Sequence, residues 1–262
     1  MTILDTIAEH ARHRVDEDRK LVPFEAVKEQ ALALDAGNGA SFYKALARPG
    51  VSFICEVKKA SPSKGLIDSV FDYRIIAGEY EEAGADAVSV LTEPKWFLGS
   101  DEIFRDIRGL IRTPMLRKDF VVDEYQIYQA RCMGADAVLL ICAILDTETI
   151  CRYLGICETL GLAALTETHD EEEIRSAVSA GAHIIGVNNR NLKDFSVDIK
   201  NASRLRENIP AGVLYVAESG VKSPEDVRNL YQAGADAILV GEALMRAADK
   251  KRMLQSFREA AL

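Results

Sequence analysis

The chain has 262 residues, of which 48% are hydrophobic and 28% charged, with a formal net charge of −9. This composition is too apolar for a disordered chain and supplies enough material for a large core. No block of lysine and arginine alternates with aromatic residues, so we expect no nucleic-acid partner. No apolar run reaches the roughly 18 residues of a membrane span. The first residues also lack a cationic stretch followed by an apolar one. We therefore expect a cytoplasmic protein without a signal peptide.

The five cysteines and the first histidines indicate no metal site. The cysteines are odd in number and none has CxxC spacing, which is typical of reduced thiols in an intracellular protein. His10 and His13 lie three residues apart on a predicted helix, without a third ligand, and we expect them to lie on a solvated face.

Three short helices are expected before the first strand, at residues 4–13, 24–34 and 41–46, because apolar residues recur there at helical spacing. They predict a helical extension over residues 1–48. It is too small to be an independent domain and should pack on the rest of the chain.

A phrase of the type Ala-Gly-Ala-Asp then occurs four times, around Gly84, Gly134, Gly181 and Gly234. The glycines are spaced by 50, 47 and 53 residues. Each follows a helix-like segment and precedes a short β run, so each is predicted to cap a helix in the left-handed conformation.

Eight short strands are expected, and a repeat of about fifty residues is therefore two βα units. The strands are predicted at residues 51–57, 88–91, 114–117, 138–141, 162–166, 184–187, 213–217 and 238–241, with the last two helices at 223–230 and 243–262. Eight such units predict an α/β fold, a (β/α)8 TIM barrel with residues 1–262 as one domain. An open doubly wound sheet is the alternative, but it rarely shows such even spacing, and no GxGxxG follows the first strand.

Charged or amide side chains follow most of these strands. In such barrels the carboxyl ends of the strands carry the chemistry. The strand ends supply Glu56, Lys58, Glu93, Lys118, Glu167, Asn188, Arg190 and Glu218. Each charge would need its own compensation in a purely structural role, so the pattern predicts a catalytic mouth.

The first strand shows the pattern most clearly. Ile54, Glu56 and Lys58 alternate onto one face, and the hydroxyl-rich loop 61–65 follows. Taken alone, this stretch also fits a structural ion pair before a turn. The loop includes Ser61 and Ser63, and its composition suits turns and anions.

A phosphate site is predicted after strands seven and eight. Ser219 and Gly220 precede one helix, and Gly241 and Glu242 lead directly into another. Backbone N–H groups at helix starts bind phosphate, and barrels often place a phosphate there. Ordinary turn glycines are the alternative reading.

Large apolar side chains also lie just beyond strand ends. They are Leu66, Trp96, Phe97 and Phe120. The sequence leaves open whether they pack loops together or form walls for an aromatic substrate.

Five motifs together resemble the indole-3-glycerol-phosphate synthase family. They are Glu-Val-Lys-Lys-Ala-Ser-Pro-Ser-Lys-Gly, Leu-Arg-Lys-Asp-Phe, Val-Asn-Asn-Arg-Asn-Leu, Glu-Ser-Gly and Val-Gly-Glu-Ala-Leu-Met-Arg, and they begin at Glu56, Leu116, Val187, Glu218 and Val240. The similarity runs from the first helices to about Met253. The first two motifs are highly specific as a pair, whereas the last two occur in many phosphate-binding barrels.

The resemblance implies a cofactor-independent carboxy-lyase of tryptophan biosynthesis. Its substrate would be 1-(2-carboxyphenylamino)-1-deoxyribulose 5-phosphate, which loses CO2 and water as the indole ring closes. Lys118 would be the general acid, with a pKa that neighbours and partial burial should lower. Glu167 and Lys58 are candidates for the dehydration step, and Glu56 would orient a lysine.

The resemblance also implies binding roles. Asn188 and Arg190 would hold hydroxyl and carboxylate groups, and Glu218 and Ser219 would lie at the sugar-phosphate end. Lys58 would be a cationic phosphate contact, and the aromatic residues would become walls for the anthranilate ring. We expect a monomer with a small phosphorylated substrate and no metal. Two alternatives remain: another phosphate-sugar enzyme of this fold, such as an isomerase, and a non-catalytic phosphate-binding barrel subunit.

Overall fold

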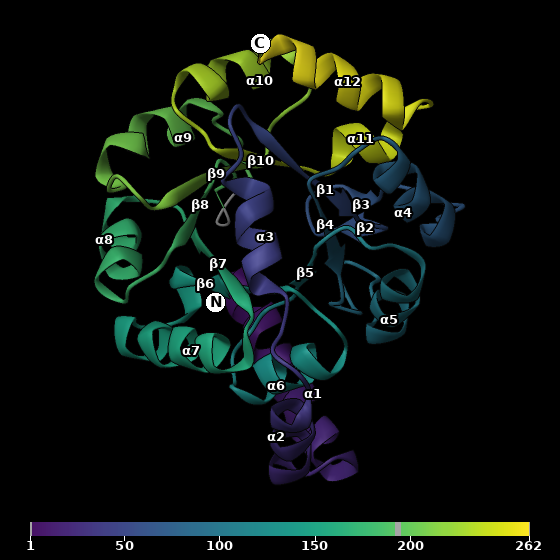
Figure 1. Cartoon of the computed structure of the whole chain (residues 1–262), viewed down its shortest axis with the longest axis vertical. Helices are drawn as coiled ribbons and strands as arrows, with labels where there is room; N and C mark the ends of the chain where they lie inside the picture. Colours follow the sequence, from purple (N-terminus) through teal and green to yellow (C-terminus); the bar gives the residue numbers. More distant parts are fainter. Residues whose placement is uncertain (1, 192–194, 262) are drawn as a thin grey trace.

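The computed structural model describes residues 2–191 and 195–261. Within these residues, eight parallel strands close into a barrel in the order β1-β10-β9-β8-β7-β6-β5-β4 (Figure 1). The strands are β1 (Ser52–Val57), β4 (Ala87–Leu91), β5 (Met115–Lys118), β6 (Ala137–Ile141), β7 (Ala163–Thr168), β8 (Ile184–Asn188), β9 (Leu214–Glu218) and β10 (Ala237–Val240). The predicted (β/α)8 barrel is confirmed and the open sheet is excluded. Leu192, which ends the third motif, and Leu262, which ends the last predicted helix, lie outside the described residues.

Helices surround the barrel; most of them connect successive strands, and the last two follow the final strand. They are α4 (Tyr73–Glu82), α5 (Asp101–Leu110), α6 (Tyr125–Cys132), α7 (Thr147–Leu160), α8 (Glu171–Ser179), α9 (Lys200–Leu205), α10 (Pro224–Gln232), α11 (Glu242–Arg246) and α12 (Lys250–Ala260), with 3-10 turns η1 (Cys142–Ile144) and η2 (Arg206–Asn208). The four repeated glycines have φ angles of 80°, 80°, 90° and 87° in chain order. This is the left-handed conformation that the repeat predicted.

The alternation of β1 separates two hydrophobic cores. Ile54 points into the barrel, where it packs with residues such as Leu116, Leu139 and Leu165. Phe53, Cys55 and Val57 instead join the layer between the strands and the helices. Glu56 and Lys58 therefore share the inward face, as the sequence predicted.

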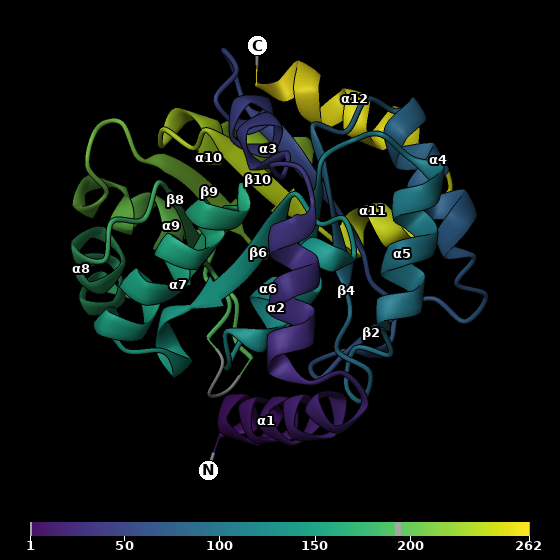
Figure 2. The ribbon, with the colours of Figure 1, turned by 60° about the horizontal axis from the view of Figure 1, so that its bottom comes forward.

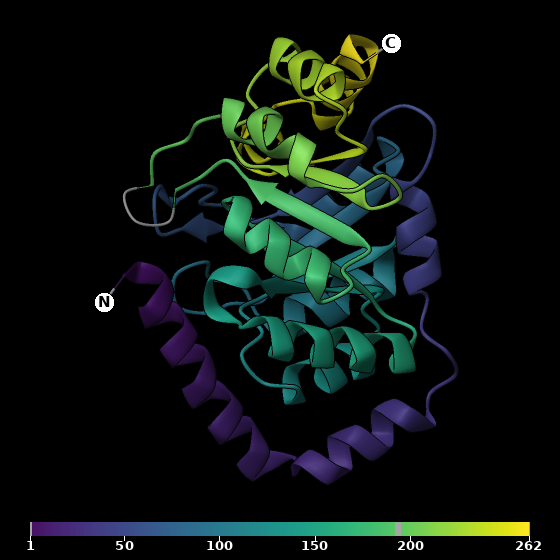
Figure 3. The same ribbon diagram turned by 90° about the vertical axis from the view of Figure 1, so that its left-hand side faces the viewer.

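The N-terminal helices lie at both ends of the barrel. They are α1 (Ile3–Leu21), α2 (Phe24–Ala33) and α3 (Gly39–Leu46). Figures 2 and 3 show α1 beyond the carboxyl ends of the strands, with α2 leading back toward α3. Phe42 and Leu46 of α3 pack into the core inside the barrel, so this helix closes the opposite end.

Two local predictions were wrong. Helix α1 continues to Leu21, eight residues past the predicted end at His13, because its later turns are held by ion pairs that a search for apolar spacing overlooks. The segment 243–262 contains two helices, since Asp249 caps a new start at Lys250. The loop after β1 contains a small antiparallel hairpin of β2 (Ala60–Ser61) and β3 (Gly65–Leu66).

Candidate active site

A cavity of about 550 Å³ opens at the carboxyl ends of the strands, and we call it the mouth cavity. Its lining includes nearly all the predicted site residues: Glu56, Lys58, Ser61, Ser63, Phe97, Lys118, Phe120, Glu167, Asn188, Arg190, Glu218, Ser219, Gly220, Gly241 and Glu242. Helix α1 adds Ile3, Leu4 and Ile7 to the lining. Sequence patterns do not identify these three as cavity residues, because an apolar helix face that covers a cavity has the same spacing as one that covers a core.

Two predicted substrate walls lie elsewhere. Leu66 is 52% exposed on the β2–β3 hairpin and does not line the mouth cavity. Trp96 packs edge-on against the His10 ring, with 5.2 Å between ring centroids, and is also absent from the lining. His10 is consequently half-buried on this side of α1, which corrects the expectation that it is solvated.

Lys118, the last residue of β5, lies among carboxylates from across the barrel. Its Nζ atom is 3.1 Å from Oε2 of Glu167 and 3.5 Å from Oε2 of Glu218. Burial alone would lower the pKa of Lys118, but Glu167, Glu218 and Glu56 outweigh it and hold the pKa well above its usual range. The expectation of a lowered pKa was therefore wrong, because the sequence does not reveal how many carboxylates face this ammonium.

The two carboxylates beside Lys118 differ in protonation. Burial opposes ionisation of Glu167, but the Lys118 ammonium, and then His169, lower its pKa to about 2. Burial raises the pKa of Glu218 to about 8, with Glu167 and Glu56 adding to the shift against the opposing effect of Lys118. Glu167 is therefore the more readily ionised of the two carboxyl groups, and Glu218 keeps its proton to a higher pH. Glu218, expected at the sugar-phosphate end, is part of this cluster around Lys118.

A second pair lies on β1, where the Lys58 ammonium donates a hydrogen bond to Glu56. This ion pair has room only because residue 241 is a glycine. A Cβ atom on Gly241 would lie 2.2 Å from Oε2 of Glu56 and 3.0 Å from Nζ of Lys58. Gly186 on β8 has the same relation to Glu218, whose Oε1 would lie 2.1 Å from such a Cβ. Real Cβ contacts are not this short, so both glycines make room for charged side chains.

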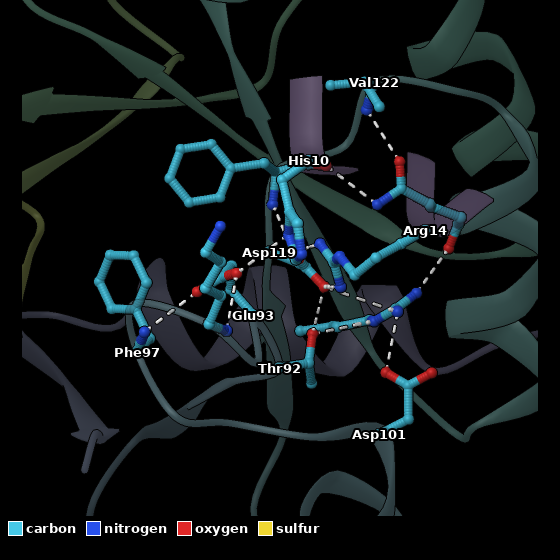
Figure 4. Close-up of polar contacts among 12 residues, drawn as sticks. His10, Arg14, Thr92, Glu93, Phe97, Asp101, Asp119 and Val122 are labelled. Atoms are coloured by element: carbon cyan, nitrogen blue, oxygen red, sulfur yellow. Dashed lines mark hydrogen bonds and ion pairs between the residues drawn. The ribbon is translucent and has the colours of Figure 1, made fainter. Parts of the chain in front are cut away.

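The residue after Lys118 is anchored to the N-terminal extension. Arg14 of α1 donates two hydrogen bonds to Asp119, of 2.7 and 3.1 Å (Figure 4). The Thr92 hydroxyl donates a third, of 2.7 Å. Arg117, which is 2% exposed, lies beside them and pairs with Asp101 at 2.9 Å. Helix α1 is therefore hydrogen-bonded to the residue that directly follows Lys118.

The same region arranges the aromatic wall. Glu93 is fully buried, and its carboxylate accepts N–H bonds from Lys95, Trp96 and Phe97 of the following loop. Phe97 then lies 6.1 Å from Phe120, centroid to centroid, and both line the mouth cavity. Glu93 thus orders the loop rather than facing the cavity, and Figure 4 shows it between His10 and Phe97.

The opposite side of the cavity contains the predicted phosphate loops. Ser219 and Gly220 have φ angles of 65° and 95°, so two successive left-handed residues turn the chain after β9. The Asn189 side chain donates to the Ser219 carbonyl at 3.0 Å and steadies this turn. Nζ of Lys64, on the hairpin loop, lies 3.8 Å from Oε1 of Glu242 and links that loop to the start of α11.

Over residues 2–191 and 195–261, no three His, Cys, Asp or Glu side chains cluster so as to hold a metal ion. No described helix has the length and apolar content to cross a membrane.

Solved structures share the fold at low sequence identity. 3-Hexulose-6-phosphate synthase superposes with a TM-score of 0.67 at 15% identity, over 81% of this chain and 100% of that one. Thiamine phosphate pyrophosphorylase from Pyrococcus furiosus gives a TM-score of 0.61 at 20% identity, over 80% and 95%. At these identities the comparisons establish the barrel alone.

Sequence relatives are much closer. A protein of Ruminiclostridium cellulolyticum named indole-3-glycerol phosphate synthase is 51% identical over 99% of this chain and 100% of its own length. Proteins with the same name from Lachnoclostridium phytofermentans and Endomicrobium trichonymphae are each 46% identical, over 98% of this chain and 98% and 100% of theirs. The family model described as indole-3-glycerol phosphate synthase matches residues 4–257. The chain therefore belongs to the indole-3-glycerol phosphate synthase family.

Proposed function

We propose that this chain is an indole-3-glycerol phosphate synthase, a decarboxylating lyase of tryptophan biosynthesis. It closes the indole ring of 1-(2-carboxyphenylamino)-1-deoxyribulose 5-phosphate with loss of CO2 and water. Family membership over residues 4–257 supports this activity. The observation that carries the residue assignments is the Lys118 ammonium, which lies between Glu167 and Glu218 in the mouth cavity.

Lys118 is assigned as the general acid of ring closure. As the aromatic carbon attacks the ketone, negative charge develops on the ketone oxygen, and a fixed ammonium beside it stabilises that charge. A raised pKa keeps the lysine protonated until this moment. An alkoxide is basic enough to take the proton, so a raised pKa is compatible with the role. The carboxylate of the anthranilate ring then leaves as CO2, and the ring regains its aromaticity.

Dehydration requires a base to remove a proton and an acid to protonate the departing hydroxyl. Glu167 and Lys58 are the candidates. The lowered pKa of Glu167 keeps its carboxylate ionised and supports its assignment as the base. Lys58, held by Glu56, is then the acid. Glu56 orients Lys58 and balances its charge.

The remaining lining residues are assigned to binding. The phosphate is placed on the N–H groups near Ser219, Gly220, Gly241 and Glu242, with Lys58 as a cationic contact. The anthranilate ring is placed against Phe97 and Phe120, while Arg190 and Asn188 hold carboxylate and hydroxyl groups. The loop with Ser61 and Ser63 would close over the substrate and exclude water. Leu66 and Trp96 are left out of this assignment because neither lines the mouth cavity.

We further propose that residues 1–262 act as one domain, with residues 1–48 as an extension packed on the barrel, and that the enzyme is a cytoplasmic monomer. The contacts of α1 with Asp119 support the single domain. Size-exclusion chromatography with light scattering tests the monomer directly.

The activity is tested by supplying the carboxyphenylamino sugar phosphate and following indole absorbance and fluorescence. A synthase gives a new indole signal together with one CO2 for each product molecule. An isomerase would change the sugar without an indole signal, and a binding subunit would hold the substrate unchanged. Either result would contradict the proposal.

A further inference from the structure

The imidazole of His169 lies between two carboxylates, one of which is Glu167. Its Nδ1 atom is 3.0 Å from Oε2 of Glu173, and the His169 backbone N–H donates to the same oxygen at 2.8 Å. On the other side, Nε2 lies 3.5 Å from Oε1 of Glu167. Glu167 thus contacts Lys118 through one oxygen and faces His169 with the other.

His169 does not line the mouth cavity. It lines a second cavity of about 570 Å³ beside the start of α1, which we call the side cavity. Glu167 lines the mouth cavity but not the side cavity. The imidazole faces Glu167, which does line the mouth cavity, so we expect its effect on the reaction to pass through that carboxylate.

The Nε2 atom of His169 is buried without a hydrogen-bond partner. A buried ring nitrogen that faces a carboxylate oxygen at 3.5 Å is well placed to act as a positive charge. Because Glu173 binds the other ring nitrogen, it fixes the ring plane and favours the doubly protonated form.

We propose that His169, held by Glu173, is a positioning residue that fixes the Glu167 carboxylate and keeps it ionised for its task in indole formation. This inference rests on the proposed function. It assigns His169 no proton transfer and no contact with the substrate.

The surrounding charges favour an imidazolium. Burial by itself would lower the pKa of His169, but the hydrogen bond to Glu173 and the charges of Glu167, Glu173 and Glu218 raise it overall. The other charged residues that line the side cavity are Asp5, Asp170, Arg190, Asp198 and Arg204. Carboxylates outnumber cations around the ring. Their attraction for the imidazolium therefore outweighs the repulsion from the two arginines, and the protonated form of His169 is favoured. The imidazolium in turn lowers the pKa of Glu167.

The proposal is tested by chemical rescue in the full-length protein. His169→Ala should lower kcat by about 10- to 100-fold, with a smaller change in KM, because the base is displaced but the substrate contacts remain. The side cavity is large enough to admit imidazole, so added imidazole should restore a substantial part of kcat. A residue needed only for folding would give no such rescue.

Two further variants separate the effect of His169 on the position of Glu167 from the effect of its positive charge. His169→Gln keeps a neutral donor near Glu167, so it should retain more activity than His169→Ala. The acid limb of its pH–rate profile should nevertheless move to higher pH by about one unit, because Glu167 has lost a neighbouring cation. Glu173→Gln should give a smaller shift in the same direction. His183→Ala is the matched control, because His183 is an exposed histidine that directly precedes β8, at the end of the barrel away from the mouth cavity.

The wild-type enzyme is assayed first, so that failure of the proposed function can be told apart from failure of the role of His169. A wild-type protein without indole formation would remove the proposed function. An active wild type with an unchanged kcat and pH profile in His169→Ala and His169→Gln would overturn the role of His169 alone. If His169→Ala does not fold, the pH profile of His169→Gln decides.

Discussion

The carboxyl group of Glu218 occupies the space beside Gly186 that a side chain would need. A Cβ atom on Gly186 would lie 2.1 Å from Oε1 of Glu218. The two residues lie on neighbouring strands, β8 and β9. A glycine inside one strand therefore determines where a carboxyl group of the next strand can lie, and with it one neighbour of Lys118.

Gly186→Ala should move the Glu218 carboxyl away from Lys118 and lower kcat by about 100-fold, because displacements near 1 Å in an active site have effects of this size. The measurement is steady-state indole formation. Gly78→Ala on α4 is the control, since a Cβ there meets nothing within 4 Å. Equal activity of the two variants would show that the position of Glu218 does not matter for the reaction.

Glu218→Gln should alter how stability depends on pH. Burial raises the pKa of Glu218 from 4.5 to about 8, so the folded protein keeps a proton that the unfolded chain releases. The stability from this group is fully present below pH 4.5 and is lost as the pH rises through about 8. Thermal unfolding of the wild type and Glu218→Gln should therefore diverge in favour of the variant over this range. A constant difference in Tm would refute the raised pKa.

Arg14→Ala should destabilise the protein by about 3 kcal/mol, because it leaves the buried Asp119 carboxylate without its main cation. Urea denaturation measures this loss. Arg12→Ala, which breaks an exposed pair with Glu9 on the same helix, should cost less than about 1 kcal/mol. Similar losses in both variants would mean that α1 is not anchored through Asp119.

Arg14→Ala should also slow catalysis in the protein that remains folded, since Asp119 follows Lys118 directly. Activity measured well below the unfolding temperature separates this effect from the loss of stability. The paired variant Arg14→Met/Asp119→Asn removes both charges together, and it should recover much of the stability that Arg14→Ala loses.

The barrel and most of the cavity could be predicted from the sequence because their signals are local. Each left-handed glycine ends a helix just before a strand, and each strand end carries its own polar residue. Helix α1 shows the limit of such local signals. Beyond His13 it is rich in charge, and Arg14 and Arg19 hold it through Asp119 and Asp123, more than a hundred residues away.

Contacts between distant strands could not be predicted for the same reason. Nothing near Lys118 in the sequence indicates that Glu218, one hundred residues later, faces it across the barrel. The direction of the pKa shift of Lys118 depends on its contacts with Glu218 and Glu167. The position of Trp96 depends on a distant contact too, because its partner His10 belongs to helix α1.

The central claim is that the Lys118 ammonium delivers the proton of ring closure, and indole formation by Lys118→Met tests it most directly. Methionine keeps the length of the side chain but removes the charge. We expect kcat to fall by about 10³-fold or more while substrate binding, measured by calorimetry, changes much less. Lys251→Met, an exposed change on α12, should match the wild type. Indole formation by Lys118→Met at the wild-type rate would contradict the account.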